Sequence, residues 1–308
     1  MKKLLPLLLT ACSTLPSAAP HTFVPLPEAT TPIEVCWIDT GGVSVPGGYG
    51  SGGSAQATTW EATSAAIVIR HPKGDLVLDT GISTQPREEQ RELSAWRSFI
   101  FGQTAGRNVP HRKLAESLTA LGVSRPMALL LSHAHADHAG GVSAVPDVPV
   151  WLAAEEKAWV ESKTSAVLPA QARAMTGRMV PIPFSEKPFA NYDASFDVFG
   201  DGSVVVVPAF GHTPGSVVTF VTVSATKRFV HVGDLINLGE SIDRKVGKSW
   251  LMSTLTDEDD AATKAQVAKL VQLREADPAL TILAAHDRPA FISLFGKDDR
   301  ALPPCISR

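Results

Sequence analysis

The sequence lacks long apolar runs and any marked excess of charge. None of its apolar stretches reaches the roughly 20 residues that a membrane-spanning helix requires. Its 28 Lys and Arg residues nearly balance 31 Asp and Glu residues, and the basic residues are scattered along the chain. A nucleic-acid partner is therefore not expected. Internal repeats and low-complexity tracts are also missing, so one domain over residues 33–308 is the simplest organisation.

Cysteine is scarce, and the first of the three cysteines lies in an unusual N-terminus. Lys2 and Lys3 precede an apolar run and the sequence Leu-Thr-Ala-Cys at positions 9–12, which resembles the bacterial lipobox. Residues 1–11 are then a signal peptide, Cys12 carries lipid, and residues 12–32 form a flexible tether. The expected product is an exported lipoprotein that faces the periplasm or cell surface and touches the membrane only through its anchor. A soluble secreted protein with a plain leader is the alternative.

The other two cysteines, Cys36 and Cys305, lie near opposite ends of the expected domain. In an oxidising compartment they can form a disulfide if the fold brings them together. Two free thiols are the equal alternative.

Short apolar runs alternate with helical patterns from residue 33 onward. Helices are predicted after Pro86, with Leu93, Trp96 and Ile100 on one face, and over residues 114–121. A third is predicted from a capping box at Thr256 to about residue 275. Strands are predicted at 33–38, 65–70, 76–78, 127–131, 204–207, 229–232 and 281–285. This order indicates an α/β fold of two packed sheets with helices outside.

Four of the predicted strands end in polar residues of one chemical type. The strands ending at residues 131, 207, 232 and 285 are followed by His133-Ala-His-Ala-Asp-His138, by His212, by Asp234 and by His286. Loops at strand ends can converge while the sheet fixes their origins. Five of the nine histidines lie in these four places, which packing alone does not explain.

Imidazole and carboxylate ligands without cysteine suit zinc, and also manganese, iron or cobalt. His133 and His135, two residues apart on an extended segment, can point the same way. Asp137 and His138 can face a second ion. A lone histidine is more often a surface or core residue than a ligand, whereas this ordered set is far more specific.

The set resembles the metallo-β-lactamase superfamily, whose mark is His-x-His-x-Asp-His followed by a distant His, Asp and His. The resemblance implies an αββα sandwich, two mixed β-sheets flanked by helices, with two divalent metal ions. It assigns the first ion to His133, His135 and His212, the second to Asp137, His138 and His286, and Asp234 to both. The resemblance also implies that two residues orient the metal ligands without binding metal. These are Asp79, in the sequence Val-Leu-Asp-Thr-Gly at residues 77–81, and Thr213.

Two ions about 4 Å apart can share a water, lower its pKa and present it as a bridging hydroxide. Asp137 or Asp234 would orient it or pass its proton to the leaving group. True β-lactamases of the superfamily lack an aspartate at the position of Asp234. The C-terminal part instead resembles the N-acyl homoserine lactonases, so hydrolysis of a lactone or carboxylic ester of a small-molecule substrate is expected. Alternatives are phosphodiester or phosphotriester hydrolysis, a thioesterase, or a non-catalytic surface lipoprotein that binds metal.

The sequence predicts the substrate-contacting residues less specifically than it predicts the metal ligands. Lactonases place a tyrosine three residues after the bridging aspartate, where this chain has Asn237, so Asn237 and Tyr49 are the candidate contacts. The glycine-rich loop around Tyr49 is either a flap over the metals or a solvated linker. Trp96, Phe99 and Phe101 would line an acyl pocket or pack a helix on the core. The sequence does not indicate the oligomeric state.

Overall fold

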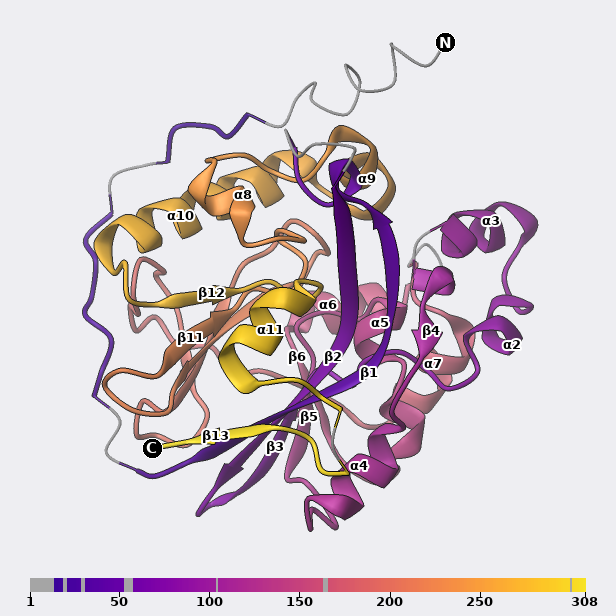
Figure 1. Cartoon of the computed structure of the whole chain (residues 1–308), viewed down its shortest axis with the longest axis horizontal. Coiled ribbons are helices and arrows are strands. Elements are labelled where there is room, and N and C mark those ends of the chain that lie inside the picture. Colours follow the sequence, from indigo (N-terminus) through magenta and orange to yellow (C-terminus); the bar gives the residue numbers. More distant parts are fainter. Residues whose placement is uncertain are drawn as a thin grey trace. The chain divides into compact units, whose positions relative to one another are not determined.

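The computed structural model describes residues 14–18, 21–28, 31–52, 58–103, 105–162, 166–299 and 301–308 (Figure 1). The chain divides into two compact units. Unit 1 comprises residues 1–30, 44–62 and 183–290, and unit 2 comprises residues 31–43, 63–182 and 291–308. The expected signal peptide and Cys12 lie outside the described residues, and the single domain over 33–308 stays a prediction. Among the described helices, none combines the length and apolarity needed to cross a bilayer.

The sheet of unit 2 has the strand order β13-β1-β2-β3-β5-β6-β7, with β4 paired to β1. β2 and β3 form an antiparallel hairpin, and β3, β5, β6 and β7 are parallel neighbours. All three residues of β5 are fully buried, as expected of a short apolar run in a parallel sheet. The strands are β1 (Glu34–Pro46), β2 (Thr59–His71), β3 (Gly74–Leu78), β4 (Val109–Pro110), β5 (Ala128–Leu130), β6 (Val150–Leu152), β7 (Met179–Pro181) and β13 (Cys305–Ser307).

Two helices of unit 2 pack on this sheet through apolar residues. Leu118 of α4 and Trp159 of α6 share one buried cluster with Leu129 of β5. The helices are α2 (Pro86–Gln90), α3 (Ala95–Gln103), α4 (Leu114–Ala120), α5 (Ala136–Ala139), α6 (Ala154–Val160), α7 (Pro169–Met175) and α11 (Arg288–Phe295), with 3-10 turns η2 (Ala105–Arg107) and η3 (Val142–Ala144).

The single amphipathic helix predicted after Pro86 is wrong. Two helices, α2 and α3, form there, and Leu93 falls in the turn between them. Trp96 is 69% exposed and stacks on Phe99, which is 56% exposed, whereas Phe101 is buried. Of the three aromatic residues Trp96, Phe99 and Phe101, only Phe101 therefore packs in the core.

The sheet of unit 1 has the order β12-β11-β10-β9-β8 (Figure 1). β10 is antiparallel to both β9 and β11, and β12 is parallel to β11. Consequently β9, β11 and β12 run in one direction and end at the same sheet edge. The strands are β8 (Phe196–Asp197), β9 (Val204–Pro208), β10 (Val217–Thr222), β11 (Arg228–His231) and β12 (Thr281–Leu283).

The long helix α10 packs on this second sheet, since Val267 and Leu270 share a buried cluster with Val207 of β9. The predicted cap at Thr256 is wrong: Thr256 ends α9, and Asp259 caps α10 by accepting a hydrogen bond from Ala262 N at 2.9 Å. The acidic residue competes better for the exposed amides of a first turn. Unit 1 contains η1 (Gly47–Tyr49), α8 (Glu240–Asp243), α9 (Trp250–Thr256) and α10 (Asp260–Ala276).

Part of the expected tether makes defined contacts in unit 1. Val24 N donates to Ala190 O at 2.8 Å, and Phe23 and Leu26 pack against the buried cluster of the second sheet. Such contacts show order in this part of residues 12–32, and the tether role of that segment stays a prediction.

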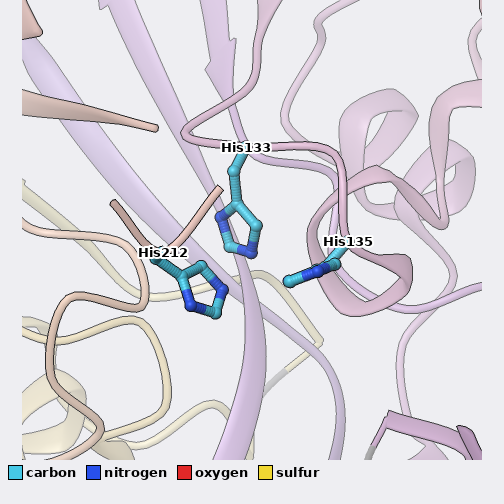
Figure 2. A group of neighbouring side chains, drawn as sticks. All are labelled: His133, His135 and His212. Atoms are coloured by element: carbon cyan, nitrogen blue, oxygen red, sulfur yellow. The ribbon is translucent and has the colours of Figure 1, made fainter. Parts of the chain in front are cut away.

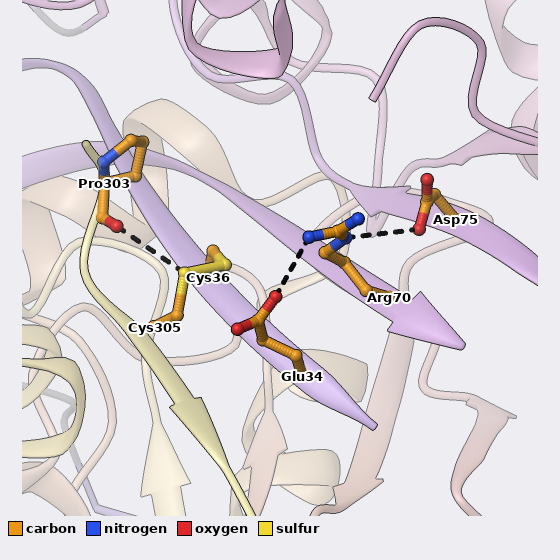
Figure 3. The surroundings of a disulfide bond; sticks show 6 residues. All are labelled: Glu34, Cys36, Arg70, Asp75, Pro303 and Cys305. Carbon is orange, nitrogen blue, oxygen red and sulfur yellow. Dashed lines mark hydrogen bonds and ion pairs between the residues drawn. A yellow bond between two sulfur atoms is a disulfide. The ribbon is translucent and has the colours of Figure 1, made fainter. Parts of the chain in front are cut away.

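A disulfide joins Cys36 on β1 to Cys305 on β13, where the two residues are directly paired across the strands (Figure 3). Beside it, Arg70 lies between Glu34 and Asp75 and pairs with both. The bond closes a loop with a sequence separation of 269 and resolves the pairing that the sequence left open.

Candidate metal centre

The loop after β5 carries two neighbouring histidines whose rings are nearly perpendicular. His133 and His135 are 4.8 Å apart between ring centroids, and they have ring nitrogens within 4.8 Å of one another (Figure 2). His138 follows on α5, and its ring centroid lies 4.0 Å from that of His133. A ligand oxygen of Asp137 lies within 4.8 Å of a ring nitrogen of His138. Unit 2 thus brings together the four ligands predicted from the His-x-His-x-Asp-His sequence.

Asp79 orients this cluster from the end of β3, the parallel neighbour of β5. Its Oδ1 accepts from Ser132 N at 2.6 Å, and its Oδ2 accepts from Ser132 Oγ at 2.7 Å and from His138 Nδ1 at 2.9 Å. Because a carboxylate only accepts hydrogen bonds, a neutral His138 ring carries its proton on Nδ1 and keeps the lone pair of Nε2. Asp79 adopts a left-handed backbone with φ of 54°, which is uncommon outside glycine.

Glu156 holds the backbone between the two histidines of the loop. It lies in the first turn of α6, is fully buried, and accepts a hydrogen bond from Ala134 N at 2.7 Å. The sequence reasoning missed Glu156, because an acidic residue in a first helical turn is ordinarily explained by the helix dipole.

The ligands predicted in unit 1 follow three strands that run in one direction. His212 comes after β9, Asp234 after β11 and His286 after β12. Asp234 Oδ2 lies 3.1 Å from His286 Nε2 and 3.6 Å from His212 Nε2. Unit 1 therefore also brings its predicted ligands together, and Figure 2 draws His212 on its loop.

The His212 loop is fixed against the start of α10. Glu258 N donates to His212 O and Asp259 N to Gly211 O, each at 2.9 Å. Gly211 has φ of 149°, and a Cβ there would lie 2.4 Å from Thr263 N. Only glycine allows this approach of loop and helix.

Two charged side chains, Asp257 and Lys248, contact Nδ1 of His212. Asp257 Oδ1 lies 2.7 Å and Lys248 Nζ 2.9 Å from His212 Nδ1, and the lysine and aspartate form an ion pair. Burial, together with Lys248, lowers the pKa of His212, so the ring is neutral near pH 7, as a metal ligand must be. Burial opposes ionisation of Asp257, but Lys248 and His212 more than offset it and the pKa of Asp257 is lowered.

Sequence reasoning missed both Asp257 and Lys248. Asp257 stands in an acidic run that the start of a helix explains equally well, and the sequence around Lys248 matches no functional motif.

The remaining predicted residues occupy turns of unit 1. Thr213 Oγ1 lies 2.7 Å from Ser216 Oγ in the turn after His212. Tyr49 ends η1, and its carbonyl accepts a hydrogen bond from Ser249 Oγ at 3.0 Å. Asn237 is 2% exposed. A ligand-supporting role of Thr213 and substrate contacts of Tyr49 and Asn237 stay predictions.

The loop around Tyr49 is not a solvated linker. Gly47, Gly48 and Ser51 are buried, and Gly52 N donates to Gly247 O at 3.0 Å. Glycine here serves close packing rather than solvent exposure.

The donor set fits a divalent metal. Five imidazoles and two carboxylates are gathered in the two units, and at His138 the buried carboxylate of Asp79 at Nδ1 leaves Nε2 of the neutral ring as the ligand atom. This arrangement is typical of zinc-binding histidines.

The model of the metallo-β-lactamase superfamily matches residues 60–286. This chain belongs to that superfamily. The expected α/β fold class, with two mixed sheets and helices, is confirmed, and the protein is a metal-dependent hydrolase.

Solved structures with the same fold include a quorum-quenching N-acyl homoserine lactone lactonase, which is 14% identical with a TM-score of 0.64 and covers 90% of this chain and 100% of that chain. An N-acyl homoserine lactone hydrolase with the product N-hexanoyl-L-homoserine at its catalytic metal centre is 14% identical, with a TM-score of 0.63 and coverage of 86% and 97%. A dizinc quorum-quenching lactonase is 17% identical, with a TM-score of 0.55 and coverage of 95% and 98%. No curated protein matches the sequence.

Proposed function

We propose that this protein uses two divalent metal ions to hydrolyse a lactone or carboxylic ester, and that zinc is the preferred metal. His133, His135 and His212 would hold one ion, Asp137, His138 and His286 the other, and Asp234 both. The observation that carries the proposal is the carboxylate–imidazole contact of Asp79 with His138, because it leaves Nε2 of the neutral ring available to a metal.

When bound, the ions would lower the pKa of a water and polarise the carbonyl oxygen of the substrate. The protein's own part is to position ligands and to move one proton. Asp137 or Asp234 would accept the proton of the attacking water as the water oxygen bonds to the carbonyl carbon. The same carboxylate would give the proton to the leaving oxygen as the carbon–oxygen bond breaks, which opens a lactone ring or frees an alcohol. Neither a serine nor a cysteine nucleophile is needed.

The choice of substrate class rests on two supports. Two of the similar folds are described with N-acyl homoserine products bound, although low identity makes this a likeness of fold only. Asp234 also argues against β-lactams, because true β-lactamases of the superfamily lack an aspartate there. Asn237 would replace the tyrosine of the lactonases as a donor to the substrate, and Tyr49 would contact the substrate from its loop.

We also propose export as a lipoprotein with lipid on Cys12. The Cys36–Cys305 disulfide supports an oxidising compartment, because such bonds rarely persist in the cytosol. Radiolabelled palmitate should enter the protein in a bacterial host and should be lost from the Cys12→Ala variant. Unlabelled wild-type protein in the medium would instead favour the soluble secreted form.

The substrate class is tested with the zinc-loaded protein lacking residues 1–20. The panel contains an N-acyl homoserine lactone, an aryl ester, a thioester, a phosphodiester, a phosphotriester and a β-lactam. We expect turnover of the lactone or ester that is abolished by a chelator and by Asp137→Asn. Asp75→Asn, a carboxylate on β3 that pairs with Arg70, is the matched control. Turnover of a phosphoester or thioester alone would replace the substrate class, and no metal-dependent turnover would leave a non-catalytic metal-binding protein.

A further inference from the structure

Lys248 places a positive charge directly behind a proposed metal ligand. Its side chain is 1% exposed, as are those of Asp257 and His212. Nζ of Lys248 lies 2.9 Å from Nδ1 of His212 and pairs with the same carboxylate oxygen, Oδ1 of Asp257, that contacts this nitrogen. The three groups form a buried chain of ammonium, carboxylate and imidazole.

The matching contact at His138 has different chemistry. There Asp79 accepts from His138 Nδ1 and from the amide and hydroxyl of Ser132, which are neutral donors. A carboxylate behind a ligating imidazole makes that imidazole a better ligand. At His212 an ammonium group shares the carboxylate, so the electron-donating effect of Asp257 on the ring is weakened.

The charge of Lys248 also acts on the ion itself. Inside a protein the effective dielectric constant is well below that of water, so the buried cation of Lys248 would repel a divalent ion bound by the His212 ring. The ion of the other set has a carboxylate, Asp137, among its own ligands. Both effects therefore disfavour an ion at His212 relative to one at His138.

We propose that Lys248 lowers the affinity for the ion assigned to His133, His135 and His212 below the affinity for the other ion. This ion would therefore bind last and dissociate first. This rests on the proposed function, because it takes both ion sites from that assignment. It adds that the two sites load in a fixed order, and that the order is set by a residue which touches neither ion.

The order is tested by adding zinc to the metal-free protein with its histidine rings labelled with nitrogen-15. The resonances of His138 and His212, assigned with single-site variants, are followed by NMR. We expect His138 to respond to the first equivalent of zinc and His212 only to the second. Simultaneous responses, or His212 responding first, would overturn the inference while leaving the metal centre intact. If neither ring responds, the proposed metal centre fails and the inference falls with it.

A pair of variants isolates the charge. Lys248→Gln keeps a donor for Asp257 but removes the charge, and Lys248→Arg keeps both. For the second zinc we expect Lys248→Gln to tighten binding about tenfold and Lys248→Arg to resemble the wild type. Lys245→Gln is the control, since Lys245 is exposed and pairs with Glu275.

A purely structural role of Lys248 predicts the opposite sign, namely weaker zinc binding in Lys248→Gln, and that result would overturn the inference. Circular dichroism establishes that each variant is folded. Should Lys248→Gln not fold, the zinc titration of the unchanged protein still decides the order.

Discussion

At the scale of single residues, the candidate centre depends on side chains that orient the ligands as much as on the ligands. Asp79, Asp257 and Glu156 each fix one histidine or the backbone beside it. Asp79 could be inferred from its strand end and a family resemblance. The roles of Asp257 and Glu156 could not be inferred from the sequence. Asp257 lies 45 residues from His212 and Glu156 lies 22 residues from Ala134, and local sequence does not determine where a loop side chain points.

Asp79→Asn should weaken metal binding without unfolding the protein. Asparagine tolerates the left-handed backbone and keeps an acceptor for Ser132 N, but its amide group opposite His138 Nδ1 favours the wrong tautomer. We expect a loss of about 10- to 100-fold in the affinity of one ion, measured by zinc competition with a chromophoric chelator. Unchanged affinity would show that Asp79 serves the fold alone.

Glu156→Ala should loosen the loop that carries His133 and His135, because the buried amide of Ala134 loses its acceptor. The expected cost is about 1–3 kcal/mol in the free energy of unfolding, measured with urea. Glu156→Gln retains an acceptor oxygen and should lose less. Equal losses in the two variants would contradict the hydrogen-bond explanation.

At the scale of elements, the direction of the strands explains why distant residues meet. β9, β11 and β12 end at one sheet edge, so His212, Asp234 and His286 gather there. The apolar runs predicted all three of these strands, and the ligand residues at their ends were predicted with them. The break between α2 and α3 and the boundary between α9 and α10 were missed. At α10 the sequence offers both Thr256 and Asp259 as the cap, and only Asp259 caps the helix.

Gly211→Ala tests how the His212 loop is fitted to α10. The new Cβ would meet Thr263 N at 2.4 Å on a backbone with φ of 149°, so we expect a loss of about 3 kcal/mol or more. Gly177→Ala is the matched control, since φ is also positive, at 75°, but nothing lies within 4 Å of a Cβ. Thermal unfolding should show the larger drop for Gly211→Ala, and similar drops would refute the close fit.

At the scale of the whole molecule, the chain is cross-linked almost end to end. The Cys36–Cys305 bond ties β13 to β1 across most of the described sequence. Sequence alone left this bond undecided, since the pairing of strands far apart in the sequence depends on the complete sheet order.

Replacing both Cys36 and Cys305 with alanine should lower the free energy of unfolding by about 2–5 kcal/mol. A reducing agent should lower the melting temperature of the wild type and leave that of the double variant unchanged, whereas equal responses would contradict the account.

The central proposal is that the protein binds two metal ions, and metal analysis tests it most directly. Protein reconstituted with zinc and freed of excess metal should contain two ions per chain by plasma mass spectrometry. His133→Ala and His286→Ala, one from each proposed set, should each retain one ion while remaining folded. A folded wild-type protein with fewer than two ions, or variants that keep both, would contradict the account.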